Sequence, residues 1–146
     1  MRRFLFDTSV FLYAVGSEHE YREPCRAIIS AQGEGELAGE ASVELIHEFA
    51  YVRSSRSTER RAAARSALDV TEICPLHEVT QTDVERALEL WCEHERLDMR
   101  DAIFAAQALN RGIDAILSPD RDFDGIEGLH RIDPGDADAV ASLEAR

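Results

Sequence analysis

The stretch Arg3-Phe4-Leu5-Phe6-Asp7-Thr8-Ser9-Val10 decides the fold of this 146-residue chain. Three apolar residues run directly into an aspartate, which is followed by two small hydroxyl residues. A short apolar run that ends in turn-forming residues is typical of a buried strand in a parallel sheet. Asp7 would lie at the carboxyl end of this strand, the edge where open α/β sheets bind ligands. Alternatively, Asp7 only caps a helix over residues 9–15.

Short apolar segments and helical patterns alternate along the rest of the chain. Further strands are predicted at residues 36–39, around Ile73 up to Pro75, at 113–117 and at 130–132. Further helices are predicted at residues 20–31, 42–52, 58–69, 80–95, 100–109 and 136–145. This alternation predicts an α/β fold in which a mostly parallel sheet of about five short strands lies between two layers of helices. Without a visible linker or repeat, we expect a single domain over residues 1–146.

Two of the predicted helices have informative apolar patterns. In residues 80–95, four apolar side chains recur at helical spacing and are predicted to face the core: Val84, Ala87, Leu88 and Trp91. Residues 100–109 are apolar nearly all round, which predicts a buried helix.

The overall charge restricts how this chain could bind nucleic acid. Its formal net charge is −13, and all 16 basic residues are arginine. This acidity argues against tight binding through bulk charge, so an RNA substrate would need a local basic patch or a bound cation. The single basic concentration, residues 53–65, contains Arg65 and four arginines that we predict to contact RNA or an acidic partner: Arg53, Arg56, Arg60 and Arg61. The alternative is a solvated helix face.

Cysteine usage and hydropathy point to the cytoplasm. The three cysteines are far apart and fit neither a zinc site nor a disulfide framework, so reduced thiols are expected. No secretory signal and no apolar run of membrane-spanning length is visible, so no membrane partner is expected.

Four acidic residues occupy positions where a site could form. Asp7 and Asp120 follow predicted strands, Asp101 opens the buried helix, and Glu48 lies within the helix over residues 42–52, one turn after Glu44. Each has a structural alternative: Asp101 could complement the helix dipole, Asp120 could start a turn, and Glu48 could be solvated.

Converging carboxylates have a chemical consequence. They repel one another unless a cation joins them. Oxygen ligands without a histidine pair or cysteine suit Mg²⁺ or Mn²⁺. Such a site activates water and stabilises charge on a phosphoryl group during in-line displacement.

Four motifs carry a resemblance to a known family. They are Phe-Asp-Thr-Ser-Val-Phe-Leu-Tyr, Ser-Val-Glu-Leu-Ile-His-Glu-Phe, Leu-Asp-Met-Arg-Asp-Ala-Ile-Phe-Ala-Ala and Ala-Ile-Leu-Ser-Pro-Asp-Arg-Asp-Phe-Asp. Their order and spacing, from Arg3 to about Pro134, resemble a PIN domain, and the length and layout resemble the VapC toxins of toxin–antitoxin pairs. The resemblance implies a three-layer α/β/α fold and a metal-dependent endoribonuclease.

The resemblance also implies roles for individual residues. The acidic quartet would be Asp7, Glu48, Asp101 and Asp120, and Ser118 matches the family's hydroxyl residue two positions before the last acid. The metal would be held by Asp7, Asp101 and Asp120. Several secondary candidates stay open: Glu44 competes with Glu48, Asp98 competes with Asp101, Asp122 and Asp124 could replace or assist Asp120, and Thr8 adjoins the first acid.

The family further implies partners. Its RNA targets are structured or bound in translation, often tRNA or ribosomal RNA, and its members form homodimers neutralised by a VapB-like antitoxin. An antitoxin arginine can fill the acidic crevice. There are three competing hypotheses. A receiver-like signalling domain would require a lysine at the site, and this chain has no lysine. A haloacid-dehalogenase phosphatase would require an aspartate in place of Ser9, and the complete quartet argues against a degenerate PIN scaffold.

Overall fold

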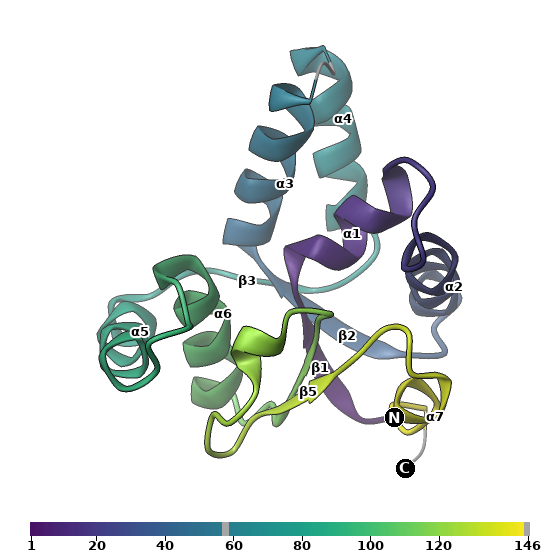
Figure 1. Ribbon diagram of the computed structural model, residues 1–146. Helices are drawn as coiled ribbons and strands as arrows, with labels where there is room; N and C mark the ends of the chain where they lie inside the picture. The colour runs from purple at the N-terminus through teal and green to yellow at the C-terminus, as the bar shows by residue number, and fades with distance from the viewer. Residues whose placement is uncertain (57–58, 145–146) are drawn as a thin grey trace.

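A five-stranded parallel sheet forms the centre of the molecule in the computed structural model, which describes residues 1–56 and 59–144 (Figure 1). The strands are β1 (Arg3–Phe6), β2 (Ala38–Ser42), β3 (Leu76–His77), β4 (Ala115–Leu117) and β5 (His130–Ile132). Their order across the sheet is β3-β2-β1-β4-β5, and every neighbouring pair is parallel. The predicted α/β fold with about five short strands is therefore confirmed.

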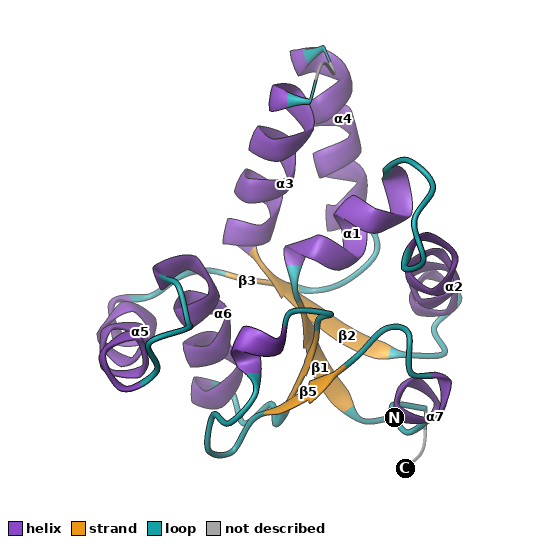
Figure 2. Cartoon of the chain, in the orientation of Figure 1, coloured by secondary structure: helices purple, strands orange, loops and turns teal. Residues whose placement is uncertain are grey.

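Helices enclose the sheet on both sides (Figures 1 and 2). They are α1 (Thr8–Val15), α2 (Arg22–Gly33), α3 (Val43–Ser55), α4 (Arg60–Thr71), α5 (Gln81–Glu93), α6 (Met99–Asn110) and α7 (Ala137–Ala141), with a short 3₁₀ turn η1 (Arg121–Phe123). Helices α5 and α6 lie on one side of the sheet, and α2 and α7 lie on the other. The α3–α4 hairpin rises beyond the carboxyl ends of the strands.

Strand β1 lies in the middle of the sheet, between β2 and β4. The side chains of Phe4, Leu5 and Phe6 are fully buried. Leu5 pairs with Glu40 of β2 on one side and with Ile116 of β4 on the other. A strand with neighbours at both edges and helices on both faces needs apolar residues at consecutive positions, which explains the unbroken apolar run.

The sheet contains a switch point beside β1. The chain passes outward from β1 to β2 and β3, and then returns to the opposite edge of β1 to form β4 and β5. The carboxyl ends of β1 and β4 meet there, because Phe6 pairs with Leu117 and the Asp7 amide donates to the Leu117 carbonyl at 3.0 Å. Ligands of open α/β sheets bind at such a point.

Two predicted strands have different bounds in the structure. The second strand was predicted at residues 36–39 and is Ala38–Ser42, and the third was predicted around Ile73 and begins after Pro75. Proline lacks an amide hydrogen for pairing, so it precedes the third strand here instead of ending it. The first residue of the helix predicted at 58–69 and the last of the helix predicted at 136–145 lie outside the described residues, and α7 ends at Ala141.

Close packing between β2 and its neighbours depends on Gly39. A Cβ atom at this position would overlap the Phe6 ring and lie 2.7 Å from both Phe4 Cζ and Gln32 Oε1. Gln32 satisfies both backbone groups of Gly39: the Gly39 amide donates to Oε1 at 2.7 Å, and Nε2 donates to the carbonyl at 3.2 Å. The glycine therefore lets α2 approach the sheet.

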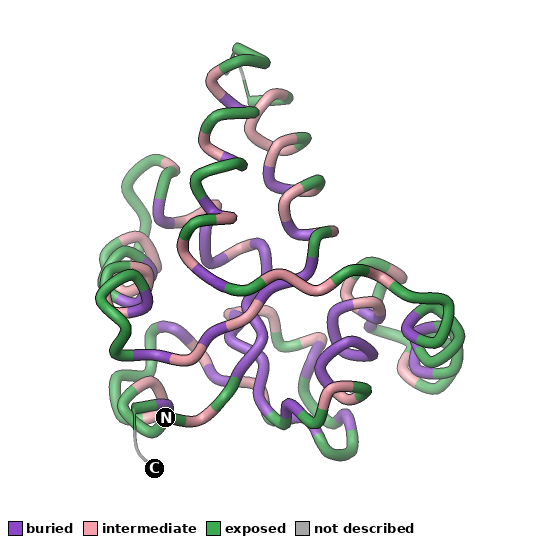
Figure 3. The backbone as a smooth tube through the Cα atoms, turned by 180° about the vertical axis from the view of Figure 1, so that it is seen from behind, coloured by how far each residue is buried: buried purple, intermediate pink, exposed green. Residues whose placement is uncertain are grey.

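The predicted inner face of α5 is correct for Ala87 but wrong for the other three residues. The side chains of Val84, Leu88 and Trp91 are 37, 45 and 49% exposed, whereas Asp83 is 1% exposed and points inward with Ala87 and Leu90. The helix is therefore rotated about its axis relative to the prediction, because a polar network holds Asp83 inside the protein. By contrast, the core-facing length of α6 is buried as predicted, and Figure 3 shows burial concentrated in the strands and the inner turns of the helices.

A polar network holds Asp83 inside the protein. Its carboxylate accepts hydrogen bonds from the Thr80 amide at 3.0 Å, from Asn110 Nδ2 at 2.9 Å and from both terminal nitrogens of Arg111 at 2.9 and 3.0 Å. These donors lower the pKa of Asp83 far below its usual value against the opposing effect of burial. Apolar spacing cannot reveal such a network, because the residue that anchors the helix is charged.

Candidate active site

Four acidic side chains converge at the switch point of the sheet. Asp7 follows β1, Asp120 follows β4, Glu48 comes from α3 and Asp101 from the first turn of α6. Each of the other three raises the pKa of Asp101 through its charge, which shows that all four share one electrostatic environment. These are the four acids that the sequence predicted to form a quartet.

Asp7 is held in a fixed orientation by two hydroxyls. Its side chain is almost fully buried, and its Oδ2 accepts hydrogen bonds from Ser118 Oγ at 2.6 Å and from Ser9 Oγ at 2.7 Å. Burial raises the pKa of Asp7, and the two hydroxyls lower it in part. Both hydroxyls therefore bind Oδ2, and neither uses Oδ1.

Ser118 joins the two strand-end acids. It is fully buried, and while its hydroxyl donates to Asp7, its Oγ accepts a hydrogen bond from the Asp120 amide at 3.0 Å. Asp120 Oδ1 in turn accepts from the Asp122 amide at 2.9 Å, which starts the η1 turn. These hydrogen bonds connect the loop after β4 to the carboxyl end of β1.

Asp98 and Asp101 have different positions at the start of α6. Asp98 is the N-cap residue, and its Oδ1 accepts from the Asp101 amide at 2.9 Å. Burial, followed by the charges of Asp7, Asp98, Asp120 and Glu48, raises the pKa of Asp101 to about 8. Burial and the surrounding negative charge therefore both favour the protonated form of Asp101.

Glu44 and Glu48 also separate. Glu44 Oε1 forms a hydrogen bond at 2.7 Å with Nδ1 of His47, whose side chain is exposed. The Glu48 side chain is only 14% exposed and raises the pKa of both Asp7 and Asp101 through its charge. Of the two glutamates, the structure places Glu48 with the other acids.

The remaining secondary candidates differ in burial: Asp122 and Asp124 lie at the periphery, whereas Thr8 is buried beside Asp7. Asp124 is exposed and pairs with Arg131 Nε at 2.7 Å. Burial and the charge of Asp120 raise the pKa of Asp122, which borders the site on η1. Thr8, the first residue of α1, is fully buried, and its hydroxyl has no hydrogen-bond partner within residues 1–56 and 59–144.

The donor set fits a hard divalent cation. The groups that meet at the site are carboxylates and hydroxyls, which are the ligands that Mg²⁺ and Mn²⁺ prefer. The described part of the chain contains no three carboxylates, imidazoles or thiols already at metal-binding spacing. The carboxylates repel one another, which raises the pKa of Asp101 and opposes their approach to metal-binding spacing. A bound cation would remove this repulsion.

The predicted basic patch belongs to the α3–α4 hairpin. Arg53 lies near the end of α3, Arg56 follows it, and Arg60 and Arg61 begin α4. The side chains of Arg56, Arg60 and Arg61 are exposed, whereas that of Arg53 is partly buried. At a rise of 1.5 Å per residue, Arg56 lies about 12 Å beyond Glu48 along the axis of α3. The hairpin thus carries positive charge outward from the acidic edge (Figure 1).

Sequence reasoning assigned no role to Arg100, which contacts the site directly. Arg100 Nη1 lies 3.1 Å from Glu48 Oε2, and Nη2 lies 3.9 Å from Asp98 Oδ2. The available signal was its place in the Leu-Asp-Met-Arg-Asp motif, between two acids in the first turn of a helix. A cation is unfavourable there unless nearby negative charge holds it.

Comparison with known proteins places this geometry in a family. Residues 4–129 match the PIN domain. Ribonuclease VapC7 of Mycobacterium tuberculosis is 30% identical over 143 residues, which cover 97% of this chain and 99% of the relative.

Solved structures share the fold at lower identity. VapBC2 from Rickettsia felis, bound to a DNA fragment from its promoter, superposes with a TM-score of 0.68 at 15% identity, over 90% of this chain and 98% of that one. Mycobacterium tuberculosis VapC20, a sarcin–ricin-loop-cleaving toxin, gives a TM-score of 0.65 at 19% identity, over 84% of this chain and 90% of that one. From the matched domain and the near full-length relative, this chain belongs to the PIN-domain family and, within it, to the VapC ribonucleases.

Proposed function

We propose that Asp7, Glu48, Asp101 and Asp120 form the active site of a divalent-metal-dependent endoribonuclease, the toxin of a type II toxin–antitoxin pair. The observation that supports this proposal best is the shared electrostatic environment of the four acids at the switch point of the sheet. An acid whose pKa is raised to about 8 by burial and by like charges is the expected companion of a cation site.

The proposed roles follow from position. Asp7 Oδ1, Asp101 and Asp120 would hold Mg²⁺ or Mn²⁺, which supplies polarisation of a water molecule and stabilisation of charge on the phosphoryl group. Ser118 and Ser9 orient Asp7 by binding its other oxygen. Asp101 gives up its proton when the cation is bound, because the opposite charge stabilises its carboxylate.

Glu48 is the proposed general base. Water attacks an RNA phosphodiester, the new bond forms between its oxygen and phosphorus, and the bond to the leaving ribose oxygen breaks. The proton lost by the water passes to the carboxylate of Glu48, and the leaving oxygen takes a proton from solvent. No side-chain nucleophile takes part in this reaction.

The decisive test is RNA cleavage by protein purified without antitoxin, assayed with Mg²⁺ and with EDTA. We expect cleavage with Mg²⁺, none with EDTA, and none with Asp120→Asn under either condition. Full activity in EDTA would overturn the metal-dependent proposal. Activity that survives in Asp120→Asn would show instead that a contaminating nuclease is responsible.

Partners and location complete the proposal. We propose that RNA, including tRNA or ribosomal RNA, docks on Arg53, Arg56, Arg60 and Arg61, that a VapB-like antitoxin neutralises the protein, and that the chain forms a homodimer in the cytoplasm. The antitoxin assignment is supported by a solved structure with this fold, since the Rickettsia felis structure is a VapBC complex. Across residues 1–56 and 59–144, none of the helices has both the length and the apolar character that crossing a membrane requires.

A further inference from the structure

Arg100 makes an ion pair that stability alone does not explain. Its guanidinium lies 3.1 Å from Glu48 Oε2, yet the arginine side chain is 61% exposed whereas that of the glutamate is 14% exposed. An exposed arginine pays side-chain entropy and is screened by water, so a pair of this kind contributes little to folding. The pair does, however, place a positive charge at the rim of the acidic site.

The position of Arg100 at the start of a helix is unfavourable for its positive charge. It is the second residue of α6, where the partial positive charge of the helix end opposes a cation. Its surroundings overcome this repulsion, since Glu48 and Asp98 both lie within 4 Å of its guanidinium nitrogens. Within the described part of the chain, Glu48 is the one member of the acidic quartet that forms an ion pair.

We propose that Arg100 is a phosphate-binding residue of this active site, which exchanges its contact with Glu48 for a non-bridging oxygen of the RNA phosphodiester. This inference rests on the proposed nuclease function. A guanidinium offers five donors in a planar fork that matches phosphate geometry, and its 3.1 Å contact with Glu48 is made through the terminal nitrogen Nη1. The long, exposed side chain is free to move to an incoming phosphate.

The exchange would have two effects. The arginine offsets the repulsion between polyanionic RNA and a carboxylate-rich edge at the site itself, whereas Arg56, Arg60 and Arg61 lie at the far end of the α3–α4 hairpin, where α3 ends and α4 begins. When the guanidinium moves to phosphate, Glu48 loses its partner, and its carboxylate is free to accept the proton from the attacking water. Substrate arrival would thus release the base.

The inference predicts opposite effects on metal and RNA. Arg100→Gln removes a positive charge from the site, so Mg²⁺ should bind several-fold more tightly, as read from the Mg²⁺ concentration that gives half-maximal thermal stabilisation without RNA. RNA binding, measured with Ca²⁺ in place of Mg²⁺, should weaken about 3- to 30-fold. The slope of log K against log salt should fall by about 0.7, the value for one phosphate contact on a single strand. Single-turnover cleavage should slow at least tenfold.

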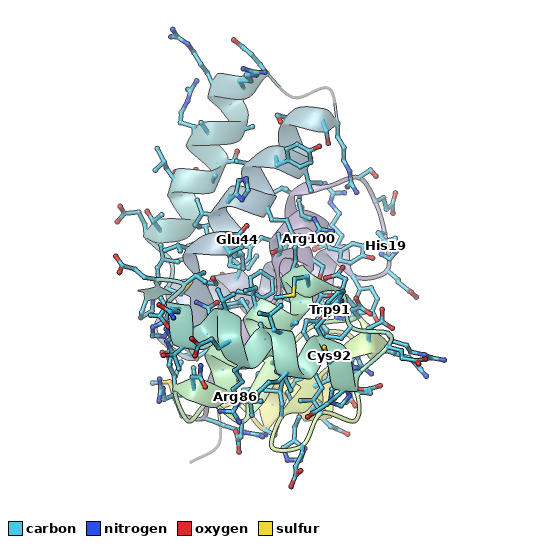
Figure 4. The ribbon with its side chains drawn as sticks, turned by 90° about the vertical axis from the view of Figure 1, so that its left-hand side faces the viewer. His19, Glu44, Arg86, Trp91, Cys92 and Arg100 are labelled. Carbon is cyan, nitrogen blue, oxygen red and sulfur yellow. The ribbon has the colours of Figure 1, made fainter. Side chains whose placement is uncertain are left out.

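Two further variants make the test specific. Arg86→Gln makes the same charge change on α5, well away from Arg100 (Figure 4), at an exposed arginine whose Nη1 donates to Asn110 Oδ1 at 2.9 Å. It should leave metal binding, RNA binding and cleavage at wild-type values. Arg100→Lys keeps the charge but loses the fork, so it should retain the salt slope and recover only part of the cleavage rate.

The outcomes separate the possibilities. If Arg100→Gln matches Arg86→Gln in RNA affinity and salt slope, Arg100 does not bind phosphate. If Arg100→Gln weakens Mg²⁺ binding together with cleavage, the arginine only positions Glu48, and the inference fails. A wild type that binds RNA but never cleaves it would contradict the proposed nuclease function, while the salt slopes would still decide the role of Arg100. A wild type that binds no RNA would overturn both.

Discussion

Ser118 Oγ donates a hydrogen bond to Asp7 Oδ2 at 2.6 Å, although the two residues are 111 positions apart in the sequence. Ser118 Oγ also accepts a hydrogen bond from the Asp120 amide at 3.0 Å. One buried hydroxyl therefore couples the acids that end β1 and β4. The coupling is directional: the hydroxyl hydrogen goes to Asp7, and the lone pair goes to the backbone of Asp120. Displacement of either acid must break a buried hydrogen bond.

Removing this hydroxyl should impair cleavage more than stability. Ser118→Ala should lower the cleavage rate about 10- to 100-fold, as loss of a group that orients a metal ligand does. It should lower the free energy of unfolding by about 1 kcal/mol. Ser9→Ala is the matched control, because Ser9 binds the same Asp7 oxygen without contacting Asp120. Equal losses in both variants would contradict the coupling.

The two glutamates of α3 should differ in function. Glu48→Gln preserves size and hydrogen bonding but removes the proposed base, so single-turnover cleavage should fall about 100-fold or more. Glu44→Gln alters only the pair with His47, and cleavage should be unchanged. The reverse order of activities would exchange their assignments.

Asp101 should make stability fall as pH rises. Its pKa of about 8 in the folded protein lies above that of an unfolded aspartate, so the folded state binds the extra proton. The stability due to protonated Asp101 is fully present below about pH 4 and is lost as pH rises toward 8. In urea unfolding with EDTA, Asp101→Asn should therefore be about 1–3 kcal/mol more stable than wild type at pH 8, and the difference should shrink at pH 5.

A control and a rescue accompany the pH experiment. Asp114→Asn changes an exposed aspartate at the opposite edge of the sheet, paired with Arg2, and its stability should follow the wild-type pH profile. Mg²⁺ should stabilise the wild type at pH 8 more than Asp101→Asn, since a ligand stabilises the state that binds it. Parallel pH profiles for wild type and Asp101→Asn would show that Asp101 is not perturbed.

The hairpin arginines should govern the salt dependence of RNA binding. Replacing Arg60 and Arg61 by serine should weaken RNA binding, measured by titration with labelled RNA. The slope of log K against log salt should fall by about 0.7–0.9 for each lost phosphate contact. The expected loss is uniform across RNA sequences, because phosphate contacts carry no sequence information. Unchanged binding of both RNA and antitoxin would return these residues to a solvated helix face.

Gly39 should tolerate no side chain. Gly39→Ala places a methyl group against Phe4, Phe6 and Gln32, so it should lower the free energy of unfolding by about 2–3 kcal/mol in urea. Gly33→Ala is the matched control, because a Cβ atom at the end of α2 meets nothing within 4 Å. It should be neutral or slightly stabilising, because alanine favours the helix more than glycine does. Equal destabilisation by both would contradict the packing argument.

The sequence predicted those features that depend on local pattern. The apolar run before Asp7 identified the central strand, and acids after strands identified the carboxyl edge. Features set by distant partners were missed. The inner face of α5 follows Asp83, whose donors include Arg111, 28 residues away. The two-residue strand β3 is too short to show a periodicity. The importance of Arg100 comes from its contact with Glu48 on another helix, and helical spacing within one element cannot predict such a contact.

The order of the strands also determines when this site can exist. Ser118, which orients Asp7 together with Ser9, and the loop to Asp120 are synthesised more than a hundred residues after Asp7. Because β4 follows β1 by more than a hundred residues, a chain that stops before β4 lacks Ser118 and Asp120 and cannot form this centre. The strand order therefore makes assembly of the site depend on synthesis of β4 and the loop that follows it.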